Sequence, residues 1–138
     1  MDRRFLLDTN IALFAIHEPK ELERQVKEIV DDCYHLLYIS TISVQEMIHL
    51  VNGGKFGKKW KSPDDVLPAL DAMGCTLLPL RREHLETYAK LRPIAGHNDP
   101  FDHIIISQAI SEQMALVSSD HKFFDYTTQK LKFIFNER

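Results

Sequence analysis

Four acidic residues, far apart along the chain, stand where a carboxylate could do chemistry: Asp8, Glu46, Asp102 and Asp120. Carboxylate oxygens are the ligands that Mg²⁺ and Mn²⁺ prefer, and carboxylates that converge need a cation between them because their mutual repulsion raises their pKa values. A metal ion held in this way can activate a water molecule as a nucleophile and neutralise charge on a phosphoryl oxygen. The four residues are therefore candidates for a metal-dependent hydrolytic site, provided that the fold brings them together.

The segment around Asp102 gives the strongest indication of such a site. Pro100 suits the first position of a helix, and Asp99 before it can cap that helix by accepting a bond from a free backbone N–H. Asp102 shares a helical face with Ile106 and Ala109, and such an apolar face normally turns toward the interior. A carboxylate on that face needs a partner, and a metal ion is one candidate.

Short apolar runs alternate with helical patterns along the rest of the chain. Strands are predicted at residues 4–7, 36–39, 75–78 and 115–118, with a weaker edge strand at 131–135. Helices are predicted near residues 11–15, 19–32, 41–51, 63–74, 82–92 and 100–109. Strands separated by helices of this length imply right-handed parallel crossovers. We therefore expect a three-layer α/β/α sandwich with a mostly parallel central sheet of four to five strands.

This architecture gives the acidic residues a common location. Ligand sites in open parallel sheets form beyond the carboxyl ends of the strands, and Asp8 and Asp120 each follow a predicted strand. Glu46 lies one to two turns into the helix after the second strand, and Asp102 begins the helix before the fourth. All four are expected at one edge of the sheet. Nearby polar groups that could orient the carboxylates or a water molecule are Thr9, Asn10 and Ser118.

Length and composition restrict the class of protein. The chain has 138 residues, 44% of them hydrophobic, so we expect one domain over residues 1–138. No apolar run approaches the length of a membrane span, which predicts a cytosolic protein without a membrane partner. Cys33 and Cys75 are predicted to be buried free thiols. The net charge is −3, but without the four candidate ligands 16 acidic residues face 17 basic ones, a balance that permits nucleic-acid binding.

Four short motifs, taken in order, resemble the successive motifs of PIN-domain ribonucleases. They are LDTN at residues 7–10, SVQE at 43–46, DPFD at 99–102 with ISQA at 106–109, and VSSD at 117–120. The resemblance implies metal ligands at Asp8, Glu46, Asp102 and Asp120, with Asp99 as an accessory. It also implies Mg²⁺ or Mn²⁺ as cofactor and RNA as substrate.

Residues 97–109 most resemble the VapC-type toxins of bacterial toxin–antitoxin pairs. That resemblance implies cleavage of structured RNA, a small antitoxin partner and a homodimer. An apolar surface around Phe14, Leu22 and Val26 is expected to receive an antitoxin helix. One residue departs from the pattern, because many relatives carry Arg where this chain has His103.

Other functions fit parts of the sequence. A housekeeping RNA-processing nuclease would have the same carboxylates. A PIN-like module that binds RNA or protein without catalysis is a further alternative, and the complete set of four carboxylates argues against it. A phosphatase of the haloacid dehalogenase type would need a second Asp two residues after Asp8, where this chain has Asn10. Metal-dependent RNA cleavage would distinguish a nuclease from both the non-catalytic module and the phosphatase.

Residues 55–61, which we call the basic segment, combine lysines with aromatic side chains. The candidates for RNA contact are Lys55, Lys58, Lys59, Trp60 and Lys61. Lysines can pair with phosphates while an aromatic ring stacks on unpaired bases. The alternative is a solvated loop with Trp60 packed in the core or against a second copy of the chain. His97 and His121 are expected to be surface loop residues.

Overall fold

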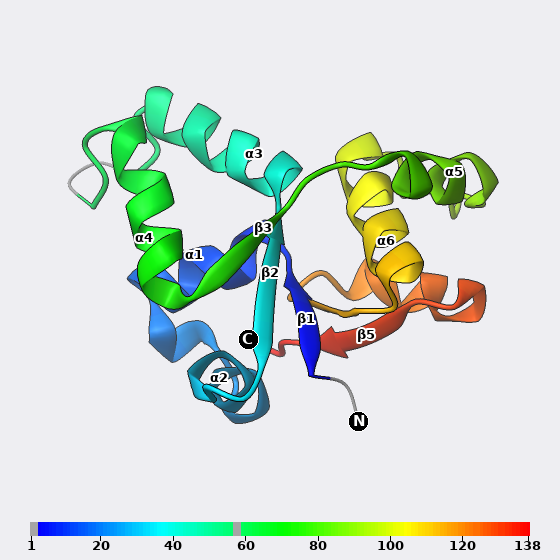
Figure 1. Cartoon of the computed structure of the whole chain (residues 1–138), viewed down its shortest axis with the longest axis horizontal. Coiled ribbons are helices and arrows are strands. Elements are labelled where there is room, and N and C mark those ends of the chain that lie inside the picture. The colour runs from blue at the N-terminus through cyan, green and yellow to red at the C-terminus, as the bar shows by residue number, and fades with distance from the viewer. Residues whose placement is uncertain (1–2, 57–58) are drawn as a thin grey trace.

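The computed structural model describes residues 3–56 and 59–138 (Figure 1). Within them, five parallel strands form one sheet in the order β3-β2-β1-β4-β5. The strands are β1 (Arg4–Leu7), β2 (Leu36–Ser40), β3 (Cys75–Leu78), β4 (Ala115–Ser118) and β5 (Lys132–Phe135). The weak run at the end of the chain is thus a fifth, edge strand. The predicted parallel sheet is confirmed.

Helices cover both faces of the sheet. The α-helices are α1 (Thr9–His17), α2 (Arg24–Asp31), α3 (Thr41–Asn52), α4 (Val66–Met73), α5 (Arg82–Lys90) and α6 (Pro100–Glu112). Three 3₁₀ helices accompany them in the described residues: η1 (Pro19–Glu21), η2 (Pro63–Asp65) and η3 (His121–Gln129). Figure 1 shows α1 to α4 on one side of the sheet and α5 and α6 on the other. The expected three-layer α/β/α sandwich is confirmed.

The alternation of side chains along β1 divides the core in two. Phe5 and Leu7 pack with residues of α1 to α4, whereas Leu6 points to the opposite face and packs with α6 and η3. β1 lies between β2 and β4, so its two faces are both covered by helices. This central position places the residue after β1, Asp8, in the middle of the carboxyl edge of the sheet.

The predicted helix over residues 19–32 is broken in the structure. η1 ends at Glu21, the backbone of the next residue, Leu22, is extended, and α2 begins only at Arg24. The side chain of Asn136 lies beside this break. Its Oδ1 accepts a hydrogen bond from Glu23 N at 2.7 Å, and its Nδ2 donates to Glu21 O at 3.0 Å. The backbone groups that a continuous helix would pair are satisfied instead by a residue from the far end of the chain.

Two further features differ from the sequence-based expectations. η3 was not predicted, although it buries Phe123 and Tyr126 completely. Cys33 is exposed in the connection between α2 and β2, so its predicted burial is wrong, while Cys75 is buried and both thiols are free. Among the described residues, no helix combines the length and apolar character that crossing a membrane requires.

Candidate active site

The four candidate carboxylates reach one cavity from four different elements. Asp8 follows β1, Glu46 lies in the second turn of α3, Asp102 in the first turn of α6, and Asp120 two residues after β4. Together with Thr9, Asn10, Leu13 and Leu50 they line a cavity of about 300 Å³, which we call the acidic cavity. The structure therefore brings together side chains that are separated by more than half of the chain.

Asp8 is the most deeply buried of the four, with 7% of its surface exposed. It caps α1: its Oδ1 accepts a hydrogen bond from Thr9 N at 2.9 Å, and its Oδ2 accepts one from Ser118 Oγ at 2.7 Å. The pKa of Asp8 is raised to about 6. Burial is the largest cause and the negative charges of Asp102 and Glu46 add to it, while the two hydrogen bonds act in the opposite direction. A cation in the cavity would stabilise the ionised Asp8 against both its burial and the repulsion from the neighbouring carboxylates.

Asp102 is half-buried and has a single side-chain partner among the described residues. His97 Nε2 lies 3.0 Å from its Oδ2. Burial raises the pKa of Asp102, the hydrogen bond from His97 lowers it, and the nearby charges of Asp99 and Asp120 raise it. Like Asp8, Asp102 is thus a carboxylate whose ionised form is unfavourable without a counter-charge.

Ser118 connects Asp8 to Asp120. Its hydroxyl donates to Asp8 Oδ2 and accepts a hydrogen bond from Asp120 N at 3.0 Å. Asp120 in turn caps η3, because its Oδ1 accepts from Lys122 N at 3.0 Å. Ser118 was predicted as an accessory residue, and its hydroxyl lies between Asp8 and Asp120; an orienting role for it stays a prediction.

Asp99 caps α6, accepting a hydrogen bond from Phe101 N at 2.9 Å, and does not line the acidic cavity. It lines instead a second cavity of about 500 Å³ between α3 and α6, which we call the α3–α6 groove. The groove shares two carboxylates, Glu46 and Asp102, with the acidic cavity. The exposed ring of Phe101 lies in it as well.

The donor set of the acidic cavity fits a hydrated divalent cation. Within residues 3–56 and 59–138, no three His, Cys, Asp or Glu side chains approach closely enough to form a metal cage on their own. Mg²⁺ does not need such a cage, because it keeps several of its water molecules. Two buried oxygens in residues that line the cavity, Thr9 Oγ1 and Asn10 Oδ1, have no hydrogen-bond partner in the described protein. They could receive hydrogen bonds from such waters or bind the ion itself.

The prediction for His97 is wrong, because its side chain is only 4% exposed and contacts Asp102. His103 is also buried, and its Nε2 donates to the carbonyl oxygen of His97 at 2.8 Å. No local sequence pattern predicts these contacts, because His97 lies in the loop before α6, where side chains follow no helical or strand periodicity. The one signal in the sequence was that His97 begins the segment with the strongest family resemblance. His121 is exposed, as predicted, but it is the first residue of η3 and does not lie in a loop.

The sequence model of the PIN domain family matches residues 5–128. This chain belongs to the PIN domain family. PIN domains are generally nucleases that depend on divalent metal ions, which agrees with the carboxylates at the carboxyl edge of the sheet. No curated protein matches the chain in sequence.

Solved structures share the fold of this PIN domain over nearly its whole length. VapBC2 from Rickettsia felis, bound to a promoter DNA fragment, is 22% identical with a TM-score of 0.70, covering 97% of this chain and 99% of that one. VapBC-1 from nontypeable Haemophilus influenzae is 20% identical with a TM-score of 0.66, covering 96% and 97%. FitAcB from Neisseria gonorrhoeae is 22% identical with a TM-score of 0.63, covering 96% of each chain.

The basic segment of this PIN domain is only partly available to a ligand. Lys55, Lys59 and Lys61 are exposed, and Lys59 Nζ lies 3.3 Å from Glu18 Oε1. Lys58 lies outside the described residues. Trp60 is 7% exposed, with ring centroids 4.5 Å from His17 and 5.1 Å from Phe56. Trp60 thus packs in the core, which was the alternative reading, and its ring is not free to stack on a base.

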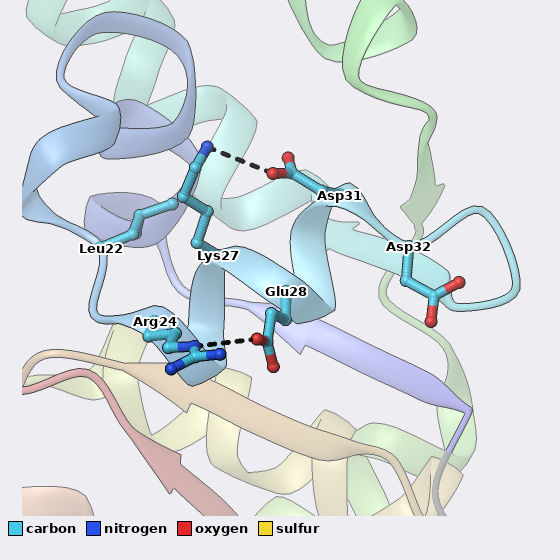
Figure 2. Close-up of a pocket in the computed structure, with 6 residues that line it drawn as sticks. All are labelled: Leu22, Arg24, Lys27, Glu28, Asp31 and Asp32. Atoms are coloured by element: carbon cyan, nitrogen blue, oxygen red, sulfur yellow. Dashed lines mark hydrogen bonds and ion pairs between the residues drawn. The ribbon is translucent and has the colours of Figure 1, made fainter.

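The apolar surface expected around Phe14, Leu22 and Val26 is not present. Leu22 and Val26 are buried in the core, and the guanidinium of Arg138 lies 4.6 Å from the ring centroid of Phe14. A shallow depression of about 740 Å³ does run along α2 (Figure 2), but its lining is mainly charged. These charges pair along the helix, Arg24 with Glu28 at 3.2 Å and Lys27 with Asp31 at 3.1 Å. The depression shares no residue with the acidic cavity.

Proposed function

We propose that this PIN domain is a divalent-metal-dependent endoribonuclease and the toxin of a toxin–antitoxin pair. The observation that carries the nuclease proposal is the acidic cavity, in which four carboxylates from α3, α6 and the ends of β1 and β4 line one space. The raised pKa values of Asp8 and Asp102 support it, because buried carboxylates near other negative charges are typical of sites that hold a cation.

The residues that would hold Mg²⁺ or Mn²⁺ are Asp8, Glu46, Asp102 and Asp120. The bound ion would supply an activated water molecule and neutralise charge on the scissile phosphate. Thr9, Asn10 and Ser118 would orient the carboxylates and the water. The α3–α6 groove would give the RNA strand a path to the cavity, with Asp99 at its side as an accessory residue, and the lysines of the basic segment would contact phosphates.

The toxin proposal is supported by the solved VapBC and FitAcB structures, whose fold this chain shares. We infer from them a small antitoxin partner and, from the resemblance of residues 97–109, a homodimer that acts in the cytoplasm on structured RNA. Expression of the chain alone in bacteria should stop growth, and Asp8→Asn should restore it. Growth without inhibition, or a monomer in sedimentation at micromolar concentration, would favour an RNA-processing nuclease.

RNA cleavage is the direct test of the nuclease proposal. The purified chain should cut structured RNA such as tRNA with Mg²⁺ or Mn²⁺, and Asp8→Asn or Asp102→Asn should remove most of that activity. Asp71→Asn is the matched control, because Asp71 is an exposed carboxylate on α4 outside the cavity. Cleavage at full rate in excess chelator would contradict the mechanism. No cleavage under any condition would favour a catalytically inactive module that binds RNA or protein.

A further inference from the structure

We propose that His97 is a positioning residue that fixes the orientation of the Asp102 carboxylate, and that His103 holds the backbone of His97 for this purpose. The inference rests on the proposed function, because it concerns how one carboxylate of the acidic cavity is presented to a cation. It gives a role to two buried histidines, His97 and His103, whose presence is not explained by metal binding to the four carboxylates alone.

The hydrogen bond from His97 divides the two oxygens of Asp102. Nε2 lies 3.0 Å from Oδ2, and when Asp102 is ionised, as a metal ligand must be, its carboxylate can only accept, so Nε2 then carries the hydrogen. Among the described residues, no side chain or backbone group bonds to Oδ1 of Asp102. One oxygen is therefore held by the protein, and the other is left for the acidic cavity that Asp102 lines. A ligating carboxylate fixed in this way loses less conformational freedom when a metal ion binds.

Aromatic rings hold the imidazole of His97 in place. Its ring centroid lies 5.0 Å from that of His103, 5.4 Å from Tyr126 and 5.7 Å from Phe123. Phe123 and Tyr126 belong to η3 and are completely buried. The ring of His97 thus lies between the start of α6 and η3, where it cannot rotate freely. η3 begins just after Asp120, so the same small helix supports two of the four carboxylates.

The backbone of His97 is fixed at both of its polar groups. Its N–H donates to Ile94 O at 3.0 Å, and its carbonyl accepts from His103 Nε2 at 2.8 Å. Gly96, with φ of +86°, lies in the turn directly before His97, a conformation that other residues rarely adopt. His103 does not line the acidic cavity. At the position where many relatives carry Arg, this chain therefore uses a side chain that secures the loop.

Another buried histidine of the chain shows what a structural role looks like. His84 is completely buried, its Nε2 lies 2.8 Å from Glu112 Oε2, and its Nδ1 accepts from Arg81 N at 3.0 Å. The bond between His84 and Glu112 joins α5 to α6, and neither residue lines the acidic cavity. The two histidines share burial and a carboxylate partner but differ in where that carboxylate lies. His84 is therefore a matched control for His97.

The test measures binding of Mn²⁺ alone to the full chain by calorimetry, together with kcat and KM for RNA. His97→Phe removes the hydrogen-bond donor, while His97→Gln can place an amide N–H near the position of Nε2. We expect His97→Phe to weaken Mn²⁺ binding about 10- to 100-fold and His97→Gln to recover part of that loss. kcat should be lowest in His97→Phe and intermediate in His97→Gln, while KM for RNA stays unchanged in both. His84→Gln should lower Tm but leave Mn²⁺ affinity at the wild-type value.

Each outcome bears on the proposal. Wild-type Mn²⁺ affinity in His97→Phe, in a wild-type protein that binds Mn²⁺ and cuts RNA, would overturn the role of His97 and leave the nuclease proposal intact. Equal losses in His97→Phe, His97→Gln and His84→Gln would overturn it too, because they would indicate a general loss of structure. If His97→Phe does not fold, His97→Asn replaces it, since its shorter amide cannot reach Asp102. A wild-type chain that neither binds Mn²⁺ nor cuts RNA would overturn the proposed function and this inference together.

Discussion

Ser118 Oγ donates a hydrogen bond of 2.7 Å to Asp8 Oδ2, across 110 positions of sequence. The two residues follow adjacent strands, since Leu7 of β1 pairs with Val117 of β4. Asp8 N also donates to Val117 O at 2.9 Å, which continues the ladder one residue beyond β1. The register of the sheet therefore sets the distance between the buried carboxylate and its hydroxyl partner.

Ser118→Ala should weaken metal binding and lower stability. It removes the hydrogen bond that lowers the pKa of Asp8, so Asp8 is protonated more often at neutral pH and competes less well for a cation. It also leaves Asp120 N without its partner, at a cost of about 1–3 kcal/mol in the free energy of unfolding. Urea denaturation and Mn²⁺ titration measure the two effects. Ser43→Ala is the control, because Ser43 Oγ is buried without a hydrogen-bond partner and its removal should cost little. Equal effects of both variants would contradict this account.

The stability of the metal-free protein should depend on pH through Asp8. Its pKa rises from 3.8 to about 6 on folding, so the folded state holds the proton more tightly than the unfolded chain. The resulting stabilisation is fully present below pH 3.8 and is lost as the pH rises through about 6. Its size is on the order of 3 kcal/mol. Denaturation in chelator between pH 4.5 and 7.5, roughly the range in which the shift acts, compares wild type with Asp8→Asn. The free energy of unfolding should fall much less with rising pH in Asp8→Asn than in the wild type. An equal fall in both proteins would mean that Asp8 does not cause the pH dependence.

Asp102→Asn should separate a metal ligand from a structural carboxylate. The Asn oxygen can still accept from His97 Nε2, while the repulsion from Asp99 and Asp120 disappears. In chelator the variant should therefore melt at or above the wild-type Tm. Mn²⁺ at about a hundred times its Kd should stabilise the wild type by about 2.7 kcal/mol and the variant much less. Thermal melts with Mn²⁺ and with chelator provide the measurement. A variant that melts several degrees lower in chelator would make Asp102 structural.

The lysines of the basic segment should make RNA binding depend on salt. The variant to test replaces four of them by Gln: Lys55, Lys58, Lys59 and Lys61. Each phosphate contact that is lost should reduce the slope of log affinity against log salt by about 0.7 to 0.9. The control variant makes the same change in charge with exposed lysines elsewhere: Lys20, Lys27, Lys90 and Lys130. An equal change of slope in both variants would show that only net charge matters, and an unchanged slope in the first would mean that the basic segment does not contact RNA.

The sequence by itself determined the order of the strands and of most helices between them, and the edge at which the carboxylates meet. Both depend on local signals: short apolar runs for buried strands, and capping residues such as Ser40 and Asp99 before helices. Because parallel strands end at a common edge, residues directly after them, such as Asp8, could be placed near one another without any knowledge of packing.

The tertiary structure alone decided which side chains are buried and what they bond. The break before α2 depends on Asn136, and the burial of Trp60 depends on His17 and Phe56. His97 lies in a loop without periodicity, and only the folding of η3 and α6 around it creates the contact with Asp102. Each of these contacts joins separate elements, and the packing of the whole core sets how closely those elements approach. The spacing of residues along the chain therefore does not predict them.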